Sequence, residues 1–78
     1  MNLKKLGANL TEIDTGKMQI LVSYQTPVAM HYSGDDMVYI TDKFWSRTTS
    51  HHINSWINDN LTDTITQSAL DNLLSEVK

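Results

Sequence analysis

The chain of 78 residues contains no cysteine, a single proline, three glycines and only six Lys/Arg residues against nine Asp/Glu residues. Without cysteine, neither disulfides nor thiolate-bound zinc can stabilise the fold. A chain of this length buries only about 60% of the surface that its unfolded form exposes. Because nothing compensates for so small a core, the composition favours a homo-oligomer.

Positive charge and apolar runs are also scarce. The formal net charge is −3 and the cations are scattered, which argues against a general binder of duplex DNA. Apolar runs such as Ile20–Val22 are far shorter than the ~20 residues of a membrane span, and no signal-peptide core follows the first lysines. We therefore expect one soluble domain over residues 1–78 that stays in the cytoplasm and contacts no membrane.

The glycines and the proline mark turns between segments in which apolar residues alternate with polar ones. Gly16 and Gly34 predict hairpin turns, and Pro27 predicts a strand start or an edge position. The alternating positions are Met18, Ile20, Val22 and Tyr24, then Val28, Met30 and Tyr32, then Val38 and Ile40. With a weaker strand at Leu10–Ile13, they predict an antiparallel meander of three to four strands within about residues 8–41, with one face wet.

After Ser50 the apolar spacing changes to that of a helix. The apolar positions are Ile53, Trp56, Ile57 and Leu61, and then Leu70, Leu73, Leu74 and Val77. They predict two helices, over about residues 50–61 and 65–77. Asn58 or Asn60 is expected to end the first helix.

The second helix is expected to begin at a capping box formed by Thr64 and Gln67. Two amphipathic helices that follow a half-wet sheet must cover its apolar face. We therefore predict an α+β fold with both helices packed on one face of the sheet. Trp56 would lie in the core, against the strand face that carries Ile20, Val22 and Met30. The second helix could instead reach a neighbouring subunit.

The segment from Lys43 to His52 leads straight into the first predicted helix and carries the candidate binding site. A helix start has unpaired N–H groups and a partial positive charge, and acidic residues usually occupy it. Here the first turn has no acid, so a phosphate or carboxylate from outside could bind there. The candidate ligand-binding residues are Lys43, Arg47, Thr48, Thr49, Ser50, His51 and His52. In the alternative readings, Thr48 or Ser50 only caps the helix, or the cluster contacts the protein's own carboxylates.

Signals for catalysis and for metal binding are weak. Ser50, His52 and Asp42 can be combined into a nucleophile, base and acid, but no nucleophile elbow or Gly-rich oxyanion loop accompanies them. His51 and His52 point about 100° apart on a helix. No Glu or Cys at ligand spacing completes a zinc site with them or with His31. We therefore expect no enzyme activity, no metal and no cofactor.

The turn at Asp35-Asp36 lacks the spaced oxygen ligands of a calcium site. Tyr39 alternates with Val38 and is expected to be exposed. An exposed ring near cations could stack a nucleic-acid base, although interface residues of this kind are more common.

Between Tyr24 and Trp56 the chain resembles a group of small, mostly uncharacterised bacteriophage-encoded proteins. The resemblance rests on the step Thr26-Pro27-Val28-Ala29 and on the pattern Ser-x-Thr-Thr-Ser-x-His-Ile-x-x-Trp from Ser46 to Trp56. It implies a phage origin, and hence the cytoplasm of a bacterial host, but it brings no activity with it.

These observations favour a small phage accessory protein that acts by stoichiometric binding. It would inhibit a host or anti-phage defence component by binding a protein or a phosphate-bearing nucleotide. The alternatives are a single-stranded nucleic-acid-binding protein and a structural or assembly protein of the virion. Nucleic acid ranks behind the other partners because of the negative net charge.

Overall fold

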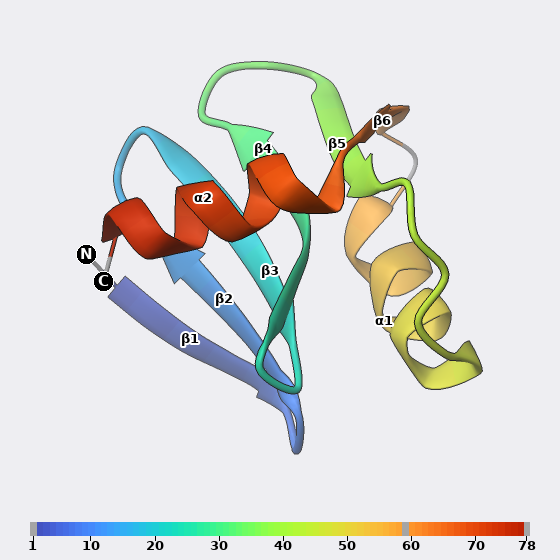
Figure 1. Ribbon diagram of the computed structural model, residues 1–78. Coiled ribbons are helices and arrows are strands. Elements are labelled where there is room, and N and C mark those ends of the chain that lie inside the picture. The colour runs from blue at the N-terminus through green and yellow to red at the C-terminus, as the bar shows by residue number, and fades with distance from the viewer. Residues whose placement is uncertain (1, 59, 78) are drawn as a thin grey trace.

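The computed structural model describes residues 2–58 and 60–77, which form one six-stranded sheet and two helices (Figure 1). The strands are β1 (Asn2–Gly7), β2 (Leu10–Asp14), β3 (Met18–Ser23), β4 (Thr26–Tyr32), β5 (Met37–Thr41) and β6 (Leu61–Ile65). The helices are α1 (Arg47–Ile57), between β5 and β6, and α2 (Gln67–Val77), at the end. The strands follow one another across the sheet in chain order. The predicted α+β class is thus confirmed.

The sheet is larger than predicted and is mixed rather than wholly antiparallel. β1 to β5 form an antiparallel meander, but β6 pairs parallel to β5, with Met37 opposite Leu61 and Thr41 opposite Ile65. Parallel neighbours need a crossover connection, and α1 provides it. The prediction of three to four antiparallel strands is therefore wrong in strand number and in the direction of the last strand.

The two helices cover opposite faces of the sheet, whereas both were predicted on one face. Ile20 of β3 packs with Leu70 and Leu74 of α2, while its neighbour Leu21 packs with Ile53 of α1. Successive strand residues point to opposite faces, so this pair shows that both faces of β3 are buried. In Figure 1, α2 crosses one face of the sheet and α1 lies off to the side of β4 and β5.

Trp56 does not lie against the strand face that carries Ile20. It is half-buried and packs with the cluster around Leu21 and Ile53, on the face that α1 covers. The prediction that Trp56 lies in the core against that strand face is wrong, because the helix that carries it packs on the second face. That second face was expected to be wet, although Leu21 and Ala29 are completely buried on it.

Helix α1 begins three residues earlier than predicted, and its cap is Ser46 rather than Thr48 or Ser50. The Ser46 hydroxyl accepts a hydrogen bond from the Thr49 backbone N–H at 3.1 Å, in the manner of an N-cap. Asn58, one of the two residues expected to end the helix, is its C-cap, with a left-handed φ of 45°. The predicted span to residue 61 is wrong, because Leu61 begins β6.

Helix α2 begins at Gln67 and is capped by Thr66, whose hydroxyl accepts from the Ala69 N–H at 3.2 Å. The predicted capping residue Thr64 instead belongs to β6. In the part of the chain that the structure describes, neither helix is long and apolar enough to cross a membrane.

The turns at Gly16 and Gly34 are confirmed, with φ of 90° and 84°. A third hairpin joins β3 to β4 through only Tyr24 and Gln25, and Tyr24 takes a φ of 59°. Two-residue hairpins need a positive φ, which glycine or asparagine usually supplies. A tyrosine in this conformation is strained by about 1 kcal/mol or more.

Candidate functional site

The seven residues predicted to bind a ligand do not all face outwards. Thr49 is buried, and its hydroxyl lies 3.1 Å from the Ser23 hydroxyl. The same Ser23 oxygen lies 3.0 Å from Nδ1 of the half-buried His52. These contacts fasten α1 to the end of β3, so Thr49 and His52 serve the fold. Four of the other residues are exposed, and Ser50 is half-buried; the exposed ones are Lys43, Arg47, Thr48 and His51.

Ser50, His52 and Asp42, which the sequence allowed as a nucleophile, base and acid, make no hydrogen bonds with one another among the described residues. His52 contacts Ser23 instead, and Asp42 accepts a hydrogen bond from the Gln67 backbone N–H at 3.2 Å. The Ser23 side chain is only 2% exposed, so its pairing with His52 gives a substrate no access to the hydroxyl. The contact between Ser23 and His52 is therefore structural.

His31 lies far along the sheet from the helix start. Its Nδ1 lies 3.0 Å from Oε1 of Gln19, and its Nε2 contacts the carbonyl oxygen of Asp35. Among residues 2–58 and 60–77, no group of three His, Cys, Asp or Glu side chains is placed to hold a metal ion.

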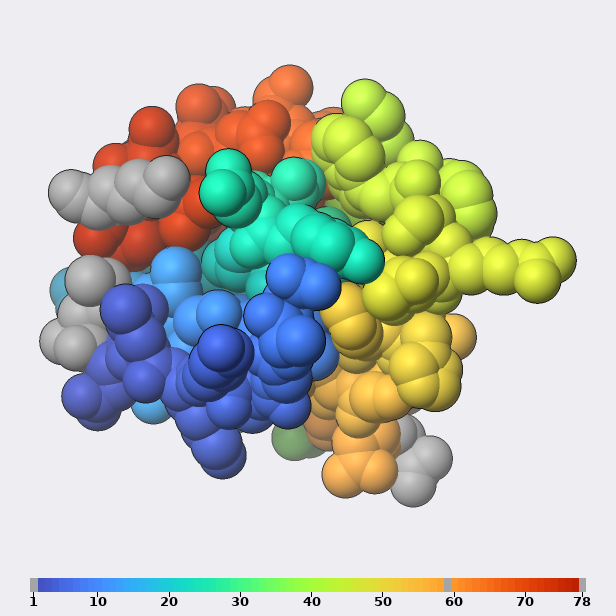
Figure 2. Space-filling model, turned by 90° about the horizontal axis from the view of Figure 1, so that it is seen from below, coloured from blue at the N-terminus to red at the C-terminus, as the bar shows by residue number. Residues whose placement is uncertain are grey.

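One end of the molecule gathers segments that are distant in the sequence. Figure 2 shows β1, the β3–β4 hairpin and the segment leading into α1 on one face, coloured blue, teal and yellow-green. We call residues 2–9, 23–27 and 43–52 the hairpin end. It includes all seven predicted site residues.

The hairpin end is cationic and rich in exposed apolar side chains. It holds four of the six Lys/Arg residues and none of the nine Asp/Glu residues, so its formal charge is +4 in a chain of net charge −3. Of the seven large hydrophobic side chains exposed in the described residues, five belong to it. These five are Leu3, Leu6, Tyr24, Phe44 and Trp45.

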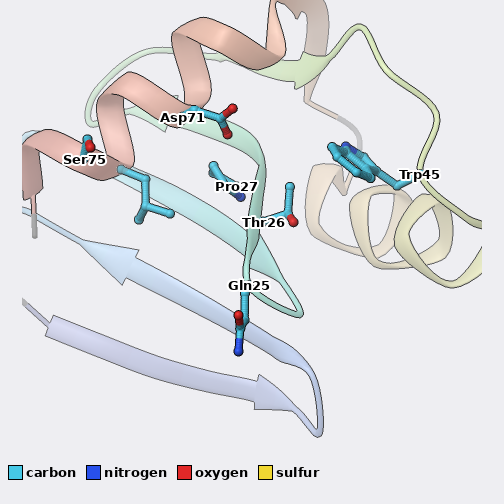
Figure 3. A pocket seen from close by; sticks show the side chains of 7 residues that line it. Gln25, Thr26, Pro27, Trp45, Asp71 and Ser75 are labelled. Atoms are coloured by element: carbon cyan, nitrogen blue, oxygen red, sulfur yellow. The ribbon is translucent and has the colours of Figure 1, made fainter.

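Two hollows adjoin each other at the hairpin tip. The larger has a volume of about 620 Å³ and is lined by Lys5, Ala8, Asn9, Thr11, Tyr24, Gln25 and Thr26. The smaller, of about 290 Å³, is lined by Gln25, Thr26, Pro27, Trp45, Asp71, Leu74 and Ser75. Figure 3 shows Asp71 and Ser75 extending from α2, and Trp45 from the segment before α1, with Thr26 and Pro27 between them. Gln25 and Thr26 line both hollows and so connect them.

The Trp45 ring is held in a defined orientation although 41% of the residue is exposed. Its Nε1 donates to Oε1 of Gln67 at 3.1 Å, and Gln67 is fixed in turn because its Nε2 donates to the Pro27 carbonyl at 2.8 Å. The Lys43 ammonium lies 4.3 Å from the centre of the Trp45 ring, a cation–π contact. An aromatic surface and a cation are thus presented together at this point.

The second aromatic residue, Tyr24, is 55% exposed at the hairpin tip, and its ring centre lies 6.5 Å from that of His52. The sequence placed Tyr24 in a strand and expected Tyr39 to be the exposed ring. Tyr39 is instead half-buried, packed at the α2 side and edge-on to Tyr32. The available signal for the hairpin end was the distribution of charge, since no acid occurs in any of its three segments.

The arrangement can bind a ligand by non-covalent contacts. Its aromatic rings can stack on a flat group, its lysines can pair with anions, and the Gln25 amide and Thr26 hydroxyl between the two hollows can form hydrogen bonds. Comparisons with curated proteins and with solved structures found no match. A family model matches residues 1–72, and the chain therefore belongs to DUF8033, a family of unknown function.

Proposed function

We propose that this chain is a non-enzymatic protein that acts by stoichiometric binding, and that the hairpin end is its binding surface. The observation that carries the proposal is the concentration of exposed apolar side chains and cations at one end. Of the seven large hydrophobic residues exposed in the described part of the chain, five occur there, together with four cations; its three segments contain no acid, and Asp71 of α2 reaches the smaller hollow. Exposed apolar groups gathered in this way mark binding surfaces more often than scattered ones do.

The charge of the surface selects an anionic partner. Phosphate-bearing ligands and acidic protein segments both complement Lys5, Lys43 and Arg47, whereas basic partners are repelled. The resemblance to phage proteins adds a setting in which binding would inhibit a host or anti-phage defence component. That setting stays a prediction.

The experiment that tests the proposal combines native mass spectrometry of protein purified from bacterial cells with a thermal-shift screen. The screen uses inorganic phosphate, mono- and dinucleotides, cyclic oligonucleotides, short single strands and an acidic peptide. We expect at least one anionic ligand to raise the melting temperature of the wild type and of Lys17→Gln, but not of the double variant Lys43→Gln/Arg47→Gln. Lys17 lies in the turn before β3, at the opposite end of that strand from the hairpin, so it is the matched control.

A result in which no ligand shifts the melting temperature and none is retained would contradict the proposal. The same holds if the double variant responds as the wild type does.

A second candidate function, self-assembly, is favoured by β1. All six residues of this edge strand are exposed, and Leu3 and Leu6 present 67% and 38% of their surface to solvent. Such an edge offers unpaired backbone groups to another strand. Binding of a second copy there fits the homo-oligomer expected from the small core.

A further inference from the structure

Each of the two hollows of the hairpin end is lined by an aromatic ring. The larger is lined by the ring of Tyr24 and the ammonium group of Lys5. The smaller is lined by the ring of Trp45, over which Lys43 lies at 4.3 Å. Each hollow is therefore lined by one aromatic ring. A cation lines the larger hollow, whereas the smaller one is lined by the Asp71 carboxylate and has Lys43 only beside its ring.

The two hollows are joined by Gln25 and Thr26, which line both of them. An amide and a hydroxyl can donate to and accept from polar edges of many kinds. A ligand that spans both hollows thus passes from the Tyr24 ring and Lys5, over neutral polar groups, to the Trp45 ring, beside which Lys43 lies. Two flat groups joined by a linker that carries negative charge complement this arrangement, provided that the charge stays away from Asp71.

The backbone at Tyr24 gives independent support. Glycine or asparagine would adopt the φ of 59° with less strain, yet the turn carries a large ring that is 55% exposed. The strained turn is held by the Tyr24 N–H, which donates to the Asn9 carbonyl at 2.6 Å. Strained residues of this kind occur preferentially at functional sites.

Resting on the proposed function, we infer that the ligand of the hairpin end is a single strand of nucleic acid. One base stacks on Tyr24 and a following base on Trp45, while Lys5, Lys43 and Arg47 contact the backbone phosphates. A duplex does not fit this chemistry, because its bases are already stacked on one another. The carboxylates of an acidic peptide would form ion pairs with the lysines, but they would not stack on the two exposed rings. Stacking is tolerant of base identity, so little sequence preference is expected.

The test is fluorescence anisotropy with labelled oligothymidylate and oligouridylate, and with a labelled duplex as comparison. We expect the single strands to bind and the duplex to bind more weakly. With three cations on phosphates, raising salt from about 50 to about 200 mM should weaken single-strand binding roughly tenfold to twentyfold. Tyr24→Gly should weaken it roughly tenfold by removing a stacking surface.

Tyr24→Gly is informative because glycine adopts the turn without strain, so the melting temperature should stay near that of the wild type. Tyr24→Phe keeps the ring and should keep the affinity. Lys17→Gln and Tyr32→Gln change an exposed cation and an exposed ring outside the hairpin end, and should leave binding unchanged.

The outcomes separate this inference from the function on which it rests. If no strand binds while a nucleotide or an acidic peptide binds in a manner that depends on Lys43 and Arg47, the nucleic-acid inference is wrong and the binding function stands. Strand binding that Tyr24→Gly leaves intact also overturns the inference. If no anionic ligand of any kind binds, both fail.

Discussion

The indole N–H of Trp56 in α1 donates a hydrogen bond to the carboxylate of Glu12 in β2, with Nε1 and Oε1 2.8 Å apart. The two residues lie far apart in the sequence, and the contact ties the crossover helix to the antiparallel part of the sheet. The indole also packs with the apolar cluster around Leu21 and Ile53. Trp56 therefore holds α1 in place by one polar and one apolar contact.

Substitutions at Trp56 should separate these two contributions. Trp56→Phe keeps most of the packing and loses the hydrogen bond, so the free energy of unfolding should fall by about 1–2 kcal/mol. Trp56→Ala loses both and should cost about 3 kcal/mol, at the low end for an aromatic residue because Trp56 is only half-buried. Urea denaturation monitored by circular dichroism measures both changes. Equal losses for the two variants would show that packing contributes nothing.

Gln67 offers a second test, because its side chain connects four neighbours. Its Oε1 accepts from Thr41 at 2.6 Å and from Trp45 at 3.1 Å, while its Nε2 donates to the Pro27 carbonyl at 2.8 Å and to Asp71 at 3.0 Å.

Gln67→Glu keeps the shape but places a carboxylate oxygen against two acceptors. We expect a loss of about 2–3 kcal/mol at neutral pH, partly restored in acid, where the new carboxyl can donate. Thermal unfolding near pH 7 and near pH 4 measures this. Gln67→Met, which is uncharged and of similar size, should show no such recovery in acid.

Much of the fold could be predicted from local signals, and the remaining parts depend on tertiary context. Gly16 and Gly34 marked turns because few other residues adopt a positive φ easily. The second helix was predicted to within two residues at its start because Leu70 and Leu74 repeat one face. In contrast, Tyr24 takes a positive φ without a glycine, and no local pattern indicates that.

The missed strands lie at the two edges of the sheet, where burial imposes little pattern. In β1 two adjacent lysines interrupt any alternation, and all its residues are exposed. In β6 only Leu61 and Ile65 are apolar, and their spacing of four fits a helix. The candidate site could likewise be predicted only in part. The sequence indicated residues 43–52, but β1 and the β3–β4 hairpin lie beside them only because of the fold's topology.

The turn before β3 predicts a defined pH dependence. The Gly16 backbone N–H donates to Asp14 Oδ1 at 2.8 Å and lowers the pKa of Asp14 below its ordinary value of 3.8, with a further contribution from Gln19. A lowered pKa in the folded state means that the ionised form stabilises the fold. This contribution is present above the unfolded-state pKa of about 3.8 and is lost as pH falls through the folded-state value.

Asp14→Asn should therefore reduce stability at neutral pH and flatten the decline in acid, because the asparagine side chain does not titrate. Melting temperatures of both proteins between neutral pH and about pH 2 provide the measurement. Curves that run parallel down to the lowest pH would contradict the proposed role of Asp14. Asp36→Asn, at another exposed turn, provides the control, because no hydrogen bond to its side chain is found in the described residues.

Assembly through β1 is the last prediction. Leu3 and Leu6 are exposed on β1, an edge strand of the sheet formed by the described residues, so a second copy can extend the sheet and cover both leucines. We expect sedimentation at micromolar concentration to show a dimer or a larger assembly. The double variant Leu3→Gln/Leu6→Gln should shift the assembly to the monomer and keep the fold, since neither side chain belongs to the two core clusters.

The matched control is Leu61→Gln, which alters a leucine at the opposite edge that is 66% exposed, close to the 67% of Leu3. If Leu61→Gln also dissociates the assembly, β1 pairs with β6 of the next copy and the chain builds an open array. A wild type that stays monomeric throughout this range would reject self-assembly through either edge.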